Sequence, residues 1–132
     1  MDSAVLDTDV VSFLFKGDDR AELYRPHLIG KLLVISFMTL AELDRWALAR
    51  NWGEARRARM EQHLRNFVVY PFHRDLCIKW AEVTVQRNRI GRPISCADAW
   101  IGATALFQDI PLISHNGSHF QDIEGLKVIT IT

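Results

Sequence analysis

Two short apolar runs in the first third of the chain constrain its fold more than any other feature. Residues 4–6 and 32–37 are almost continuously apolar, and each run is followed by a stretch with helical spacing. A continuous apolar run is typical of a parallel strand that is buried on both faces. Parallel strands need a crossover connection between them, which is usually a helix. The two runs therefore predict an α/β fold with a central parallel sheet and helices on both faces.

The rest of the chain continues this alternation. We expect strands over residues 3–7, 32–37, 67–70, 112–114 and 128–131, and helices over residues 10–15, 20–30, 39–50, 54–65, 75–89 and 97–108. The last of these helices is apolar on nearly every side, which places it in the middle of the fold. A chain of 132 residues fits one domain over residues 1–132.

The composition is that of an ordinary globular protein. Apolar residues make up 48% and charged residues 24% of the chain, which excludes a disordered or collagen-like protein. The longest apolar stretch is too short to cross a bilayer, and the N-terminus lacks the basic flank of a signal peptide. We therefore expect a cytoplasmic protein without membrane contact, in which Cys77 and Cys96 are reduced thiols in the core.

Three carboxylates stand near the expected ends of strands or starts of helices. Asp7 ends the first strand, Glu42 follows the second, and Asp98 opens the helix of residues 97–108. In open α/β sheets the ligand crevice lies beyond the carboxyl ends of the strands, so these acids can meet there. Clustered carboxylates suit Mg²⁺ or Mn²⁺, which can polarise a phosphoryl oxygen and activate a water molecule. The pattern indicates phosphodiester hydrolysis.

Each acid must also be weighed as a structural residue. Thr39 and Glu42 have the spacing of a helix capping box, and so do Ser95 and Asp98. Asp7 differs from these, because a carboxylate at a buried strand end is costly unless a partner neutralises it.

Charge is unevenly distributed although the formal net charge is zero. Residues 1–44 carry a net charge of −4, residues 45–92 carry +7, and residues 93–132 carry −3. Acidic segments beside a basic one suit a cation bound together with a polyanion such as nucleic acid. The alternative is that the arginines form the solvated face of a helix. The candidate RNA-binding residues are Arg56, Arg57, Arg59, Arg87, Arg89 and Arg92.

Four segments, in order along the chain, resemble the PIN-domain ribonucleases, and most closely the VapC-type toxins of bacterial toxin–antitoxin pairs. They are residues 5–9, 36–43, 97–105, and 112–116 with Phe120. The resemblance implies that Asp7, Glu42 and Asp98 bind one or two divalent ions and that the substrate is RNA, cleaved to leave a 5′-phosphate and a 3′-hydroxyl. It also implies a homodimer that is inhibited by a small VapB-like antitoxin, whose C-terminal segment lies across the active-site groove.

The resemblance assigns further residues to the site. It implies that Thr8 and Ser114 assist through their hydroxyl groups; Asp9 fits a helix cap and, secondarily, a supporting role beside the metal ligands. The chain departs from the family pattern at Asn116, where many members have a fourth acid. A neutral amide at that position predicts that one ion binds well and a second binds poorly.

Two other classes of function fit parts of the sequence. Residues 5–11 resemble the opening of haloacid-dehalogenase-like phosphatases, whose first aspartate attacks phosphate. Those enzymes also need a late lysine and a paired late acid, whereas the only lysine after Lys79 is Lys127 and no adjacent aspartates follow the first third of the chain. The other class is a non-catalytic nucleic-acid-binding module. Metal-dependent RNA cleavage distinguishes a nuclease from both.

Overall fold

Five parallel strands form the centre of the molecule. The structure is a computed structural model that describes residues 2–131. The strands are β1 (Ser3–Leu6), β2 (Leu32–Ser36), β3 (Val68–Tyr70), β4 (Leu112–Ile113) and β5 (Val128–Ile129). Their order across the sheet is β3-β2-β1-β4-β5, and each neighbouring pair is parallel. The predicted parallel sheet is confirmed, and β1 is its central strand.

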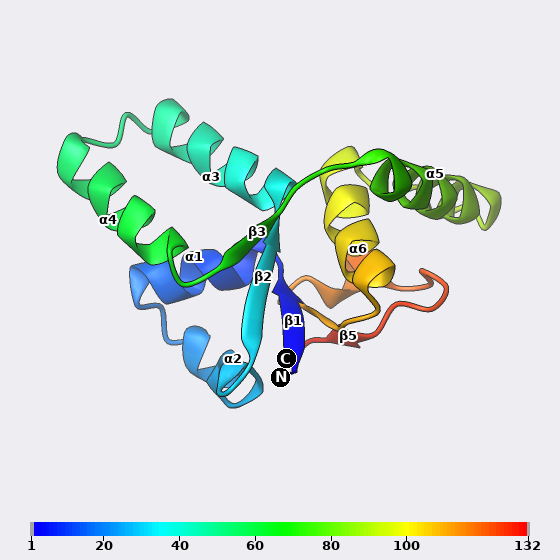
Figure 1. Cartoon of the computed structure of the whole chain (residues 1–132), viewed down its shortest axis with the longest axis horizontal. Helices are drawn as coiled ribbons and strands as arrows, with labels where there is room; N and C mark the ends of the chain where they lie inside the picture. The colour runs from blue at the N-terminus through cyan, green and yellow to red at the C-terminus, as the bar shows by residue number, and fades with distance from the viewer. Residues whose placement is uncertain (1, 132) are drawn as a thin grey trace.

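Helices cover both faces of this sheet, as predicted (Figure 1). They are α1 (Thr8–Lys16), α2 (Ala21–Leu28), α3 (Phe37–Ala49), α4 (Glu54–Leu64), α5 (Arg74–Arg89) and α6 (Cys96–Gln108), and a short 3₁₀ helix, η1, covers Gly117–Phe120. Helices α1 to α4 pack on one face, and α5, α6 and η1 pack on the other. No helix within residues 2–131 is both long and apolar enough to cross a membrane.

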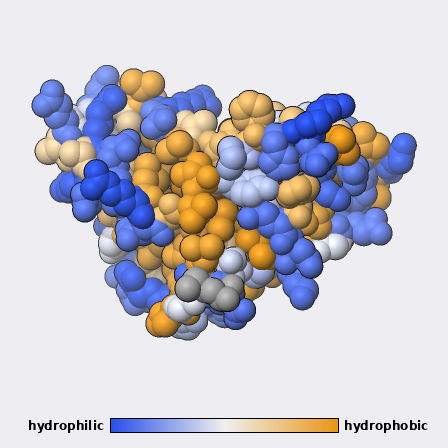
Figure 2. All heavy atoms as spheres, viewed as in Figure 1, coloured by the Kyte–Doolittle hydropathy of each residue, from blue (hydrophilic) through white to orange (hydrophobic). Residues whose placement is uncertain are grey.

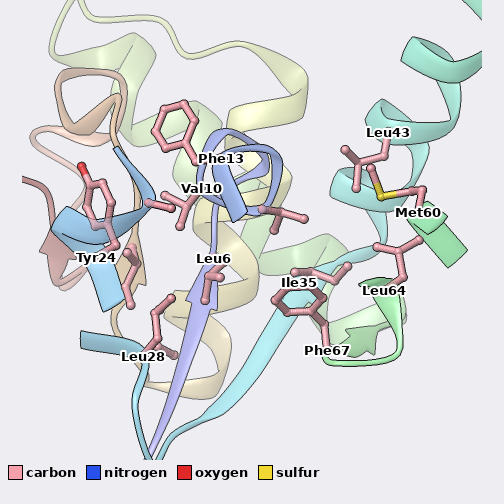
Figure 3. Packing of buried hydrophobic residues seen from close by; sticks show 14 of the residues in the cluster. Leu6, Val10, Phe13, Tyr24, Leu28, Ile35, Leu43, Met60, Leu64 and Phe67 are labelled. Atoms are coloured by element: carbon pink, nitrogen blue, oxygen red, sulfur yellow. The ribbon is translucent and has the colours of Figure 1, made fainter. Parts of the chain in front are cut away.

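Successive residues of the central strands enter two separate cores. Leu6 and Ile35 pack among α1 to α4, whereas Val5 and Val34 pack against α5 and α6, and all four are at most 3% exposed. Figure 3 shows Leu6 and Ile35 within the first core. Burying such a side chain contributes about 1.5–3 kcal/mol, which explains why these strands have no polar face.

Helix α6 lies in the middle of the fold, as its composition predicts. It packs against α5, β1 and β2, and Ile101, Ala103 and Ala105 are fully buried. At the edge of the sheet, β3 leaves Val68 and Val69 partly exposed. Figure 2 shows a band of apolar surface in the middle of one face of the molecule.

Two helices begin two residues earlier than predicted, because the residues that cap them are different. Helix α1 begins at Thr8, and its N-cap is Asp7, whose carboxylate accepts a hydrogen bond of 2.7 Å from the Thr8 amide. Helix α3 begins at Phe37, and the hydroxyl of its N-cap Ser36 accepts a bond of 3.0 Å from the Met38 amide. The interpretation of Asp9 as the first cap is therefore wrong.

The cysteine prediction is also wrong. Cys96 is exposed in the first turn of α6, and Cys77 in α5 is only half-buried. Each cysteine lies on a part of its helix that the sheet does not cover. Its position on the helix, and not the apolar character of the thiol, therefore decides how far it is buried.

Gly117 is required by a close approach of the backbone to Thr130. A Cβ atom at Gly117 would lie 2.6 Å from Cγ2 and 2.8 Å from Cβ of Thr130. We expect Gly117→Ala to lower the free energy of unfolding by about 1–3 kcal/mol, measured by urea denaturation. The matched control is Gly53→Ser, because a Cβ there meets nothing within 4 Å and Gly53 is the N-cap of α4, where serine is at least as favourable as glycine. Equal losses in the two variants would contradict this account.

Candidate active site

The predicted acids come to one edge of the sheet from both helical layers. Asp7 follows β1, Glu42 lies in the second turn of α3, and Asp98 lies in the first turn of α6. Burial, followed by the negative charge of Asp98, raises the pKa of Glu42, although a hydrogen bond from Thr8 acts in the opposite direction. Asp98 also contributes to raising the pKa of Asp7 after larger effects of burial and Asp9. The carboxylate of Asp98 is therefore near enough to repel those of both Asp7 and Glu42.

Asp7 is the most strongly perturbed of these acids. Its side chain is 5% exposed, and burial, followed by the charge of Asp9, raises its pKa to about 7. The Ser114 hydroxyl donates to Oδ2 over 2.8 Å, and the Thr8 amide donates to Oδ1 over 2.7 Å. Within residues 2–131 no cationic side chain forms an ion pair with Asp7. This carboxylate is oriented by neutral donors, and its charge is not neutralised.

Glu42 is held by a residue of another helix. The Thr8 hydroxyl donates to Glu42 Oε1 over 2.7 Å and lies 3.0 Å from the hydroxyl of Thr39. The capping-box interpretation of Thr39 and Glu42 is wrong, because α3 begins two residues before Thr39. Glu42 reaches across to α1 and so joins the edge at which Asp7 lies.

Asp98 has one predicted neighbour and one that the sequence did not indicate. Its amide donates to the hydroxyl of Ser95 over 3.2 Å, which confirms Ser95 as the N-cap of α6. Its Oδ2 lies 3.2 Å from Nδ1 of His119, and the two side chains are 23% and 55% exposed respectively. Nothing in the sequence signals the contact of His119 with Asp98, because the two residues lie on different elements.

Asp9 connects α1 to the loop after β4. Its Oδ1 accepts from the Val10 amide over 2.7 Å, and its Oδ2 accepts from the His115 amide over 3.1 Å. The hydroxyl of the fully buried Tyr24 lies 2.6 Å from Nδ1 of His115 and accepts from the Ile131 amide over 3.1 Å. Sequence reasoning missed Tyr24, because its partners lie more than ninety residues away.

Asn116 lies on the loop that Asp9 and Ser114 hold. Its amide donates to the Ser114 hydroxyl over 3.0 Å, and the residue is exposed immediately before η1. Since Ser114 also bonds to Asp7, Asn116 is one hydrogen-bonded residue away from the buried carboxylate. Its place in the turn after β4 agrees with the prediction.

The donor set at this edge suits a hard cation. Among residues 2–131, no three acidic, histidine or cysteine side chains converge closely enough to surround an ion. Glu42 bonds to Thr8, and Asp98 lies against His119. Binding one ion between them would require these two side chains to turn toward Asp7. Carboxylate oxygens are nevertheless the ligands that Mg²⁺ and Mn²⁺ prefer, and a cation would relieve the repulsion that raises the pKa of Asp7.

Three of the six candidate RNA-binding arginines make contacts within the fold. Arg57 donates Nε to the Trp52 carbonyl over 3.0 Å, which ties down the connection between α3 and α4. Arg87 is 4% exposed and donates to the carbonyls of Arg92 and His119 over 2.6 and 3.0 Å. Arg92 pairs with Asp122. The burial of Arg87 contradicts the prediction that it contacts phosphate directly, since a side chain with so little exposed surface cannot reach RNA.

The other three arginines lie on helix surfaces. Arg59 and Arg89 are exposed on α4 and α5, and Arg56 is half-buried on α4. Within residues 2–131, the guanidinium groups of these three form no hydrogen bond or ion pair, although that of Arg56 lies over the ring of Trp52.

A parallel α/β sheet with mutually repelling carboxylates at its carboxyl edge defines a class of protein suited to metal-assisted hydrolysis of phosphodiesters. The PIN domain family matches residues 4–126. Ribonuclease VapC1 of Haemophilus influenzae strain R2866 is 33% identical over 126 residues, which cover 93% of each chain. VapC ribonuclease Y4jK of Sinorhizobium fredii is 33% identical over 134 residues, covering 95% of this chain and 94% of that one.

Solved structures agree with this assignment. VapBC-1 from nontypeable Haemophilus influenzae superposes with a TM-score of 0.83 at 28% identity, covering 97% of both chains. VapBC2 from Rickettsia felis, bound to a DNA fragment from its promoter, has a TM-score of 0.84 at 18% identity over 97% of this chain and 98% of that one, and so supports the fold alone. The chain belongs to the PIN domain family, with VapC ribonucleases among its relatives. The haloacid-dehalogenase-like interpretation is therefore excluded.

The raised pKa of Asp7 predicts a pH-dependent effect of its removal. Between about pH 4 and pH 7 the folded protein holds a proton on Asp7 that the unfolded chain has lost, because the pKa is 3.8 in the absence of the fold and about 7 within it. Stability is therefore lost as the pH rises, and the whole penalty is present above pH 7. In chelator, Asp7→Asn should stabilise the protein by roughly 2–4 kcal/mol at pH 8 and have little effect near pH 4.

Urea unfolding at the two pH values measures this difference, with Asp44→Asn on the exposed surface of α3 as the matched control. If Asp7→Asn changed the free energy of unfolding equally at both pH values, the charge of Asp7 would not be what destabilises the fold.

Proposed function

We propose that this chain is the ribonuclease toxin of a toxin–antitoxin pair and that it hydrolyses RNA with the aid of Mg²⁺ or Mn²⁺ held by Asp7, Glu42 and Asp98. The observation that carries this proposal is the buried Asp7 carboxylate, which neutral donors orient and which Glu42 and Asp98 approach from two other helices. The PIN domain match and the VapC ribonuclease relatives support the same activity.

The residues around the acids have distinct tasks in this reaction. The Ser114 hydroxyl and the Thr8 amide fix the two oxygens of Asp7, and the Thr8 hydroxyl fixes Glu42. Asp9 holds the backbone of the loop that carries Asn116. The divalent ion, when bound, polarises a phosphoryl oxygen and lowers the pKa of a water molecule. We expect cleavage to leave a 5′-phosphate and a 3′-hydroxyl.

The proposal includes two protein partners. Similar solved structures include VapBC complexes from Haemophilus influenzae and Rickettsia felis. We infer that a VapB-like antitoxin covers the acidic edge of this chain with its C-terminal segment and that two copies of the chain form a homodimer. The place of action that fits an RNA substrate is the cytoplasm.

Substitution of the acids tests the activity. Asp7→Asn, Glu42→Gln and Asp98→Asn should each abolish Mn²⁺-dependent cleavage of an RNA pool, because each removes an anionic ligand. Ser114→Ala should lower metal affinity or activity about 10- to 100-fold, since it removes only the donor that orients Asp7. Glu61→Gln, on the exposed surface of α4, is the control and should cleave normally. Cleavage that persists in chelator, or in Asp98→Asn, would refute the proposal.

Asn116 determines the stoichiometry of the metal. Its side-chain oxygen can accept a hydrogen bond from metal-bound water but supplies no charge, so a second ion should bind poorly. Asn116→Asp should tighten a second Mn²⁺ and increase cleavage at low metal concentration, whereas Asn116→Ala should cost less activity than Asp7→Asn. Calorimetric titration with Mn²⁺ makes the comparison. Equal stoichiometry and affinity in the wild type and Asn116→Asp would place Asn116 outside the site.

A further inference from the structure

A cavity of about 580 Å³ lies between the end of α1 and the outer part of α4, apart from the acidic edge. Its walls include Phe15 and Lys16 from α1, Arg56, Arg59 and Gln62 from α4, and Asn66, which follows α4. None of the described residues that line it is acidic. The volume falls within the range of about 300–1,000 Å³ that is usual for ligand-binding pockets.

Arg56 is fixed in this cavity by aromatic rings. The centre of its guanidinium group lies 4.3 Å from the ring centroid of Trp52 and 5.8 Å from that of Phe15. The two rings stack on each other with centroids 5.7 Å apart and an interplanar angle of 22°. Arg56 Nε is shielded from solvent and has no hydrogen-bond partner among the described residues. Since buried donors are normally satisfied, this unpartnered donor indicates an acceptor that the chain itself does not supply.

The cavity also gathers cations that form no ion pair within residues 2–131. Across residues 2–131, Arg20, Arg25 and Arg92 form ion pairs with carboxylates, but Lys16 and Arg59 do not. Arg56 has no ion pair within that range either. Three positively charged side chains therefore line one cavity without an ion-pair partner within residues 2–131, although the charge of Asp18 acts on Lys16. Such a concentration of positive charge attracts an anion.

The neutral donors of the cavity complete the set. Gln62 and Asn66 contribute side-chain amides, and the Asn66 amide nitrogen already donates one hydrogen bond of 2.9 Å to the His63 carbonyl, so that only its second N–H is available to a ligand. His63 contributes no charge near neutral pH, because burial lowers its pKa, and its Nε2 lies 3.2 Å from the Val11 carbonyl. The cavity thus combines one held cation, Arg56, and two exposed ones with amide donors, which suits an oxyanion better than a simple halide.

We propose that this cavity is a subsite for a backbone phosphate of the RNA substrate, held by Arg56, Arg59 and Lys16. The proposal rests on the ribonuclease function and specifies how the strand is bound. Helix α1 joins the two places, because Thr8 at its start bonds to Glu42 and Lys16 at its end lines the cavity. The eight residues between them span about 12 Å. A phosphate in the cavity would therefore belong to a nucleotide near the scissile bond, and arginine suits phosphate because its planar fork can donate two hydrogen bonds.

The proposal distinguishes basic residues that line the cavity from a basic residue nearby that does not. Arg56 and Arg59 line the cavity, whereas Arg65, which follows the same helix and is exposed, does not. Removing one charge at any of the three changes the net charge equally. Only the loss of a residue that touches phosphate should change the number of counterions released on binding.

The experiment uses the full chain carrying Asp98→Asn, freed of any partner, so that RNA is bound and not cut. Fluorescence anisotropy of a labelled single-stranded RNA is recorded in chelator over a range of salt concentrations. Adding Arg59→Gln or Lys16→Gln should weaken binding several-fold and reduce the salt slope by about 0.7–1, the contribution of one phosphate contact. Adding Arg65→Gln should leave the slope unchanged. Arg56→Gln should act like Arg59→Gln if its melting temperature is preserved.

The outcomes separate this subsite from the ribonuclease function. An unchanged slope in Arg59→Gln and Lys16→Gln, or an equal change in Arg65→Gln, overturns the subsite even if the wild type cleaves RNA. Weaker binding of a polyglutamate peptide in these two variants, with RNA binding intact, would overturn it in favour of an acidic protein segment. Failure of the wild type to cleave RNA in Mn²⁺ would refute the function alone, since binding is measured without metal.

Discussion

The buried carboxylate of Asp7 is the constraint on which the rest of the site depends. The Asp7 side chain is 5% exposed, and burial raises its pKa to about 7. The charged form of this carboxylate therefore destabilises the fold unless a cation or a proton neutralises it. The surroundings orient this charge through the Ser114 hydroxyl and the Thr8 amide without neutralising it. The folded protein therefore holds an unfavourable arrangement that a divalent ion would relieve; under the proposed function, stability and metal binding would be linked through this residue.

The two helical layers meet at that residue. Glu42 comes from α3 in one layer, and Asp98 comes from α6 in the other, while Asp7 ends the central strand between them. An ion held by all three would join both layers at the carboxyl edge of the sheet. The neighbours of these acids, Thr8 and His119, come from further elements, so the geometry of the edge depends on the packing of both cores.

The basic segment of the sequence has several physical roles in the folded protein. Arg57 and Arg87 satisfy backbone carbonyls and support the fold, and Arg92 pairs with an acid. Arg56 and Arg59 line a cavity whose described walls contain no counter-charge. An excess of positive charge in a sequence therefore indicates a polyanionic ligand only where the folded protein leaves the basic side chains without internal partners.

The sequence alone determined the parallel sheet, the helices on both faces and the carboxyl edge at which Asp7 and Asp98 lie, because apolar runs and helix starts are local signals. Tertiary structure decided what those signals could not. Glu42 bonds to Thr8 instead of capping its own helix, Asp98 lies against His119, and Arg87 is buried. Each of these contacts joins residues more than twenty positions apart. Such partners are chosen by the way the two cores pack, which no short stretch of sequence encodes.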